Sequence, residues 1–121
     1  MKTDSKFEIG SKAEVLYFKI FDLTTNRKHY PVKFRRLADK LQECALCIYS
    51  TIINANAIRP DTQYCKAKRN EFQTNAIAEC DKLLSLTKYS LHAGLISSSK
   101  GEEWTCLICD IKFMTLAWRK T

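Results

Sequence analysis

The chain has 121 residues, of which 20 are Lys or Arg and 13 are Asp or Glu, so its formal net charge is +7 at pH 7. This length is typical of a single domain, and the 45% of residues that are hydrophobic suffice for one core. Three glycines and two prolines are too few for the turns of a sandwich or barrel of short strands, so the composition argues against those folds and favours helices.

The first ten residues, MKTDSKFEIG, are polar and show no helical or strand periodicity. We expect residues 1–10 to form a flexible tail in front of a helical domain that spans residues 11–121. The tail lacks the hydrophobic segment of an export signal, and no apolar run reaches the roughly eighteen residues that a membrane span needs. We therefore expect a cytoplasmic protein with reduced cysteines and no membrane partner.

Hydrophobic residues recur at helical spacing in four segments of the remaining chain. Pro31 suits the first turn of the second segment, where its missing N–H is not needed. Short connections join the segments, which favours an all-α, up-down-up-down antiparallel four-helix bundle. The sequence predicts its helices over about 11–25, 31–57, 61–93 and 99–119.

Local signals mark three of the helix ends. Ser11 and Glu14, and again Ser99 and Glu102, have the spacing of capping boxes, which predicts helix starts at Ser11 and Ser99. Gly94 follows the third apolar stripe and suits the left-handed residue that often ends a helix.

The second and fourth helices have more apolar surface than a single core requires. An isolated bundle would leave this second apolar face in water, so we expect a homo-oligomer or a docked protein partner. The residues expected at that interface are Leu46, Tyr49, Ile53, Cys106, Cys109, Phe113 and Leu116.

Six cysteines include two CxxC motifs, CALC at residues 44–47 and CLIC at residues 106–109. A zinc knuckle bends the backbone around such a motif, whereas both motifs here lie inside long helical patterns. We favour packing or interface roles and expect no metal, with a metal site or thiol chemistry as the alternatives. Because no G-x-S-x-G, HExxH or glycine-rich phosphate motif occurs, we expect no catalytic residue, cofactor or small-molecule substrate.

Basic residues cluster around the start of the second helix, and again at the start of the third helix and the end of the fourth. Such clusters typically neutralise RNA or DNA phosphates in a salt-dependent and largely sequence-independent way. Solubilising charge on exposed faces is the alternative. The candidate nucleic-acid-binding residues are Arg27, Lys28, Lys33, Arg35, Arg36, Lys40, Arg59, Lys66, Lys68, Arg69, Arg119 and Lys120.

Three segments of the chain resemble one known family. They are YPVKFRRLADKLQECALCIYSTIINANAI at residues 30–58, LLSLTKYSLHAGLISSSKGEEW at residues 83–104, and MTLAWRK at residues 114–120. The pattern is similar to the four-helix-bundle family that includes the 23S rRNA intervening-sequence proteins and the accessory variability determinants of diversity-generating retroelements.

The resemblance implies a basic homopentameric barrel that is not an enzyme. It would bind nucleic acid and a dedicated reverse transcriptase, and would help it copy a template repeat with adenine-directed errors. It also implies structural roles for Trp104 and Trp118 and places Arg35, Arg36 and Lys66, together with Arg69, in basic segments. The rival expectations are a bundle associated with ribosomal RNA, a protein–protein adaptor, and a metal or thiol protein.

Overall fold

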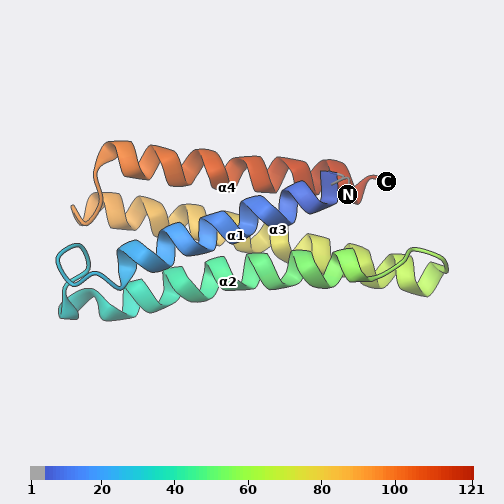
Figure 1. Ribbon diagram of the computed structural model, residues 1–121, viewed down its shortest axis with the longest axis horizontal. Coiled ribbons are helices and arrows are strands. Elements are labelled where there is room, and N and C mark those ends of the chain that lie inside the picture. Colours follow the sequence, from blue (N-terminus) through green and yellow to red (C-terminus); the bar gives the residue numbers. More distant parts are fainter. Residues whose placement is uncertain (1–4) are drawn as a thin grey trace.

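The computed structural model describes the backbone of residues 5–121 and the side chains of residues 8–121, and it consists of helices and short connections (Figure 1). No β-strand occurs among residues 5–121, so the prediction of an all-α chain with four helices is confirmed. The elements are α1 (Ser5–Thr24), the 3₁₀ turn η1 (Val32–Phe34), α2 (Arg35–Ala57), α3 (Gln63–His92) and α4 (Ser98–Arg119).

The four helices run alternately up and down as one bundle (Figure 1). α1 packs against α2 and α4, and α3 packs against the same two helices. α1 and α3 therefore lie diagonally opposite one another, as do α2 and α4. The α1–α2 and α3–α4 connections lie at one end of the bundle, which we call the α1–α2 end. The α2–α3 connection and the end of α4 lie at the other, which we call the α2–α3 end.

The bundle begins earlier than the sequence predicted. α1 already includes Ser5, and Ile9 is only 1% exposed, because Ile9, Ala13 and Leu16 continue one apolar stripe along the helix. The prediction of a tail is therefore wrong for residues 5–10, and residues 1–4 lie outside the described part of the chain. The capping box at Ser11 is also wrong, since Ser11 lies inside α1.

The starts of the other helices are also shifted. Pro31 precedes η1, so α2 begins at Arg35, four residues after the predicted start. α4 is capped by Ser97, whose Oγ accepts a hydrogen bond of 3.0 Å from the Lys100 backbone N–H. The capping box predicted at Ser99 is therefore wrong. Each of the three consecutive serines can cap a helix, and the buried Ile96 places the first of them at the helix start.

The predicted end of the third helix is confirmed. Gly94 has φ +75°, a left-handed conformation that disfavours residues with a Cβ. The Leu95 N–H donates to the Ser90 carbonyl and the Gly94 N–H donates to the Leu91 carbonyl, both at 3.0 Å, which is the Schellman arrangement. α3 starts at Gln63, where Thr62 Oγ1 accepts from the Cys65 N–H at 3.1 Å.

The core runs the length of the bundle and draws on all four helices. Trp104 is fully buried in it and Trp118 is 7% exposed near the α2–α3 end. Its other large, fully buried hydrophobic side chains are Ile9, Leu16, Ile20, Leu41, Ile48, Ile52, Leu83, Ile108 and Ile111. None of the helices in residues 5–121 is both long and apolar enough to cross a membrane.

Candidate nucleic-acid interface

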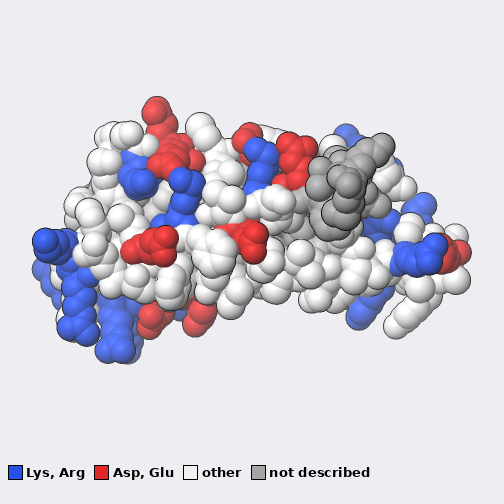
Figure 2. Space-filling view, viewed as in Figure 1, with Lys and Arg blue, Asp and Glu red and all other residues white. Residues whose placement is uncertain are grey.

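The predicted nucleic-acid-binding residues divide between the two ends of the bundle. Because α2 has 23 residues, the ends are roughly 35 Å apart. One protomer therefore does not join all twelve in one surface. The α1–α2 end, at the left of Figure 2, carries Arg27, Lys28, Lys33, Arg35, Arg36 and Lys40, which we call the cationic cluster. The α2–α3 end carries Arg59, Lys66, Lys68, Arg69, Arg119 and Lys120.

The cationic cluster differs from the opposite end in the pairing of its charges. None of its six side chains forms an ion pair with a carboxylate of the described residues. At the α2–α3 end, by contrast, Arg59 lies 3.9 Å from Asp61 and Lys68 lies 3.4 Å from Glu71. Exposed cations without a carboxylate partner attract anions more strongly than paired ones do.

Elsewhere on the bundle, opposite charges pair across neighbouring helices. Lys112 Nζ lies 2.6 Å from an Asp81 carboxylate oxygen and joins α4 to α3. Lys19 Nζ lies 2.7 Å from Glu103 and joins α1 to α4. Hydrogen bonds from Lys19 and Lys100 lower the pKa of the Glu103 carboxyl below its ordinary value.

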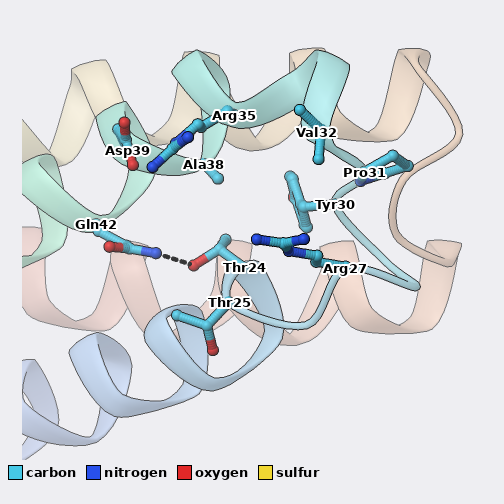
Figure 3. A pocket seen from close by; sticks show the side chains of 10 residues that line it. All are labelled: Thr24, Thr25, Arg27, Tyr30, Pro31, Val32, Arg35, Ala38, Asp39 and Gln42. Carbon is cyan, nitrogen blue, oxygen red and sulfur yellow. Dashed lines mark hydrogen bonds between the residues drawn. The ribbon is translucent and has the colours of Figure 1, made fainter.

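A first hollow of about 260 Å³ lies between the end of α1 and the start of α2 (Figure 3). Arg27 extends beneath Tyr30 and Arg35 extends towards Asp39. On the facing wall, Gln42 Nε2 donates a hydrogen bond of 2.8 Å to Thr24 Oγ1. The two guanidinium groups can bind an anionic oxygen, but the Asp39 carboxylate, which also lines the hollow, disfavours an anion beside it.

A second hollow, of about 340 Å³, lies between the start of α2 and the last turns of α3. Three members of the cationic cluster, Lys33, Arg36 and Lys40, line it together with two aromatic side chains. Lys33 Nζ lies 5.4 Å from the centre of the Phe34 ring. Tyr89, on α3, is 55% exposed. We call this hollow the α2–α3 groove, after the two helices that form its walls. It lies at the α1–α2 end of the bundle.

Arg69 does not lie on the predicted surface. Only 7% of it is exposed, and its guanidinium carbon lies 5.3 Å from the centre of a Trp118 ring. This contradicts the expectation of an exposed phosphate-binding side chain. Arg69, Gln73, Ala76 and Cys80 follow one another at helical spacing, so the buried stripe of α3 includes the arginine.

The residues predicted for an oligomer interface lie outside the core in two separate patches. On α2, Leu46 is 46% exposed and Ile53 is 43% exposed, and Tyr49 is half-buried beside α1. On α4, Phe113 is 62% exposed, Cys106 is exposed, and Cys109 and Leu116 are half-buried. Because α2 and α4 are diagonal, the two patches do not join within one chain.

Sequence reasoning missed several exposed apolar or aromatic side chains, of which one group on α1 and one residue on α3 bear on function. On α1, Val15, Phe18 and Phe21 are 45%, 52% and 39% exposed. Their spacing of three residues could have shown that they share a face. The other is Tyr89, which the sequence separates from the cationic cluster by half the chain and which only antiparallel packing of α2 and α3 brings there.

The six cysteines are free thiols, and the two CxxC motifs lie on the diagonal helices α2 and α4. Among the described residues, no group of three or more His, Cys, Asp or Glu side chains could hold a metal ion. Burial raises the pKa of Cys44, whose Sγ donates to Glu79 Oε1 at 3.2 Å. Burial also raises the pKa of Cys80 to about 12. These two thiols therefore stay protonated at neutral pH.

Together the fold and this surface define an all-α four-helix bundle whose α1–α2 end is cationic and partly aromatic. Comparison of the chain with protein-family models, curated proteins and solved structures gave no match. A function is therefore inferred from the residues and the geometry of the chain itself.

Proposed function

We propose that the protein is a non-catalytic nucleic-acid-binding protein that holds the phosphate backbone of RNA or DNA at its α1–α2 end. The observation behind this proposal is the cationic cluster, in which six exposed Lys and Arg side chains have no ion-pair partner among the described residues. If all six contacted phosphates, affinity would fall about 10³-fold between 50 and 200 mM salt.

The family resemblance extends the proposal to a partner. The protein is an accessory to a reverse transcriptase of a diversity-generating retroelement, and the nucleic acid is the template RNA or its cDNA copy. The cationic cluster supports this role because a template has to be held without regard to its sequence. Free cysteines fit the reducing cytoplasm, which is where we propose that the complex acts.

The proposal includes assembly into a homopentameric ring. A cyclic oligomer uses two different patches, one on each side of the subunit, because each subunit meets its two neighbours through different surfaces. The patch of Leu46 and Ile53 on α2 and the patch of Phe113 on α4 have this relationship. Rotational symmetry would place the α1–α2 ends of all subunits on the same side of the ring.

A pair of charge-reversal variants tests the nucleic-acid proposal. Each of the two triple variants lowers the net charge from +7 to +1, because one reversal removes two units of charge. The first variant reverses the charges of the three cations that line the α2–α3 groove, at the α1–α2 end (Lys33→Glu, Arg36→Glu and Lys40→Glu). The matched control reverses the opposite end (Lys66→Glu, Lys68→Glu and Lys120→Glu). Binding of a labelled structured RNA is followed by fluorescence anisotropy over a salt series.

We expect the first variant to bind at least tenfold more weakly than wild type and to have a shallower salt dependence, and the control to keep most of its affinity. Equal weakening of both variants would mean that overall charge, rather than the α1–α2 end, determines binding. Wild-type protein that does not bind RNA would overturn the proposal.

Light scattering tests the ring. Reduced, nuclease-treated protein should have the mass of about five chains. Phe113→Glu and Ile53→Glu should each give monomers, because each places a charge in one of the two patches, whereas Ser85→Glu at an exposed position of α3 should not. A wild-type monomer would refute the ring. Co-purification with a reverse transcriptase encoded beside the protein's gene tests the polymerase partnership.

The exposed α1 residues favour one further candidate, a protein–protein adaptor. Val15, Phe18 and Phe21 present apolar surface that the cationic cluster does not require. The salt series and the light scattering distinguish the candidates, since an adaptor would neither bind RNA nor need to form a ring.

A further inference from the structure

The α2–α3 groove has features that phosphate binding alone does not need. Lys33, Arg36 and Lys40 are sufficient to hold a backbone, yet the groove also exposes an aromatic ring beside them. An exposed tyrosine by itself is ordinary. Tyr89 is 55% exposed inside a hollow of about 340 Å³ whose other wall is cationic, and this combination points to a ligand with both charge and a flat face.

The cations and the tyrosine lie on different walls of the groove. Lys33, Arg36 and Lys40 follow one another by three and four residues along η1 and α2, so they form a row parallel to the helix axis. Leu86 and Tyr89 are three residues apart on α3 and form the opposite wall. A chain of phosphates can therefore follow α2 while the attached bases turn towards α3.

The two aromatic rings of the groove are not equivalent. The Phe34 ring already has Lys33 Nζ 5.4 Å from its centre and is half-buried. No cation is found over the Tyr89 ring among the described residues. The neighbouring Ser90 accepts a hydrogen bond of 2.9 Å from the buried Tyr30 Oη, which fixes the last turn of α3 and with it the position of Tyr89.

Bases in a duplex are stacked on one another and cannot lie against a protein ring in such a groove, whereas unpaired bases can. We propose that the α2–α3 groove binds single-stranded nucleic acid, with an unpaired base stacked on Tyr89 and the flanking phosphates on Lys33, Arg36 and Lys40. This inference rests on the proposed function and adds that the bound nucleic acid is single-stranded.

The test compares a single-stranded RNA of mixed sequence with a blunt duplex of the same length. Tyr89→Ala removes the ring, and Tyr89→Phe keeps it. Tyr64→Ala removes a 76% exposed tyrosine at the other end of the same helix and is the matched control. Circular dichroism and thermal melting establish that all three variants are folded. Binding is measured by anisotropy at one fixed salt concentration.

We expect Tyr89→Ala to weaken single-strand binding about tenfold or more and to leave duplex binding unchanged, because stacking on an aromatic ring contributes to each bound base. Tyr89→Phe and Tyr64→Ala should bind both ligands like wild type. Placing abasic sites in the single strand should weaken wild-type binding and have no effect on Tyr89→Ala.

Unchanged single-strand affinity of Tyr89→Ala would overturn the inference, and so would equal weakening of both ligands. Either result leaves the proposed function intact if wild-type binding still depends on salt and on the cationic cluster. If wild type binds neither ligand, the proposed function and the inference both fail.

Discussion

Tyr30 Oη donates a hydrogen bond of 2.9 Å to Ser90 Oγ, and both residues are buried, at 3% and 0% exposed. Tyr30 lies in the connection that also carries Arg27 and Lys28, and Ser90 lies in the last turn of α3 beside Tyr89. The bond therefore joins the two parts of the candidate interface that are farthest apart in sequence.

Tyr30→Phe should lower the free energy of unfolding by about 1 kcal/mol, because it removes this hydrogen bond and leaves the Ser90 hydroxyl without its partner. Ser90→Ala should have a comparable effect. Since both changes break the same bond, the double variant should lose less than the sum of the single losses. Urea denaturation followed by circular dichroism measures all three, and strictly additive losses would show that the bond contributes nothing.

The same tyrosine predicts a dependence of stability on pH. Burial raises the pKa of Tyr30 above its ordinary value, and the hydrogen bond with Ser90 opposes this rise. The stability that Tyr30 contributes to the fold should be complete below about pH 10, where the phenol of the unfolded chain begins to ionise. It should be lost as the pH rises through the higher pKa of the folded state. The difference in unfolding free energy between wild type and Tyr30→Phe should therefore shrink above about pH 10. A constant difference would contradict a raised folded pKa.

Two helical glycines should respond in opposite ways to alanine. A Cβ on Gly101 would lie 2.7 Å from both Leu91 Cδ atoms and 2.9 Å from Cγ, so Gly101→Ala should cost about 1–3 kcal/mol of stability through overpacking. A Cβ on Gly10 would lie 3.6 Å from Ile53 Cδ1, an ordinary contact. Gly10→Ala should therefore stabilise the protein by about 0.5–1 kcal/mol through helix propensity.

Thermal denaturation of both glycine variants checks this pair of predictions. Leu91→Ala should recover part of the loss when it is combined with Gly101→Ala, because it removes the atoms that the new Cβ would meet. A stabilised Gly101→Ala variant would mean that Leu91 moves aside at little cost.

Gln73 should make the fold less stable than a hydrophobic residue of similar shape would. It is 1% exposed, and neither atom of its side-chain amide has a hydrogen-bond partner within the described structure. Gln73→Met should raise the free energy of unfolding by about 1 kcal/mol, since an unpaired buried amide is destabilising. Gln63→Met, at an exposed position of the same helix, should have little effect. A destabilised Gln73→Met variant would reveal that the amide is hydrogen-bonded in solution.

The cysteines should differ in their reaction with iodoacetamide at pH 8. Cys106 is exposed and should be labelled first. Cys44 and Cys80 are buried, and burial raises the pKa of both thiols, that of Cys80 to about 12, so they should react only after unfolding. Peptide mass spectrometry over a time course measures each site. Rapid labelling of Cys80 in the folded protein would revive the alternative of thiol chemistry.

Local patterns predicted the helices well and their first residues poorly. Gly94 ends α3 as expected, because a left-handed C-cap depends on a few neighbouring residues. Ser11 and Ser99 were wrong as caps because Ser97 and an earlier apolar turn at Ile9 compete with them. Burial in the core decided between these options.

The candidate interface was only partly predictable. Clustering in the sequence identified Lys33, Arg36 and Lys40, whose lack of ion-pair partners became visible only when the carboxylates of the other helices were placed. Arg69 also belongs to a cluster of basic residues in the sequence, but α3 is rotated so that this side chain lies against Trp118. Charge in the sequence therefore does not reveal which cations are free.

The sequence by itself determined that the protein is helical, that it has four helices and that it is strongly basic, because periodicity, turn chemistry and charge are properties of local sequence. Only the tertiary structure decided which cations are paired with carboxylates, that the two apolar patches are separate, and that Tyr89 and Arg36 line the same groove. These features depend on how each helix is rotated about its axis and which helix lies next to it, and residues far apart in the chain set both.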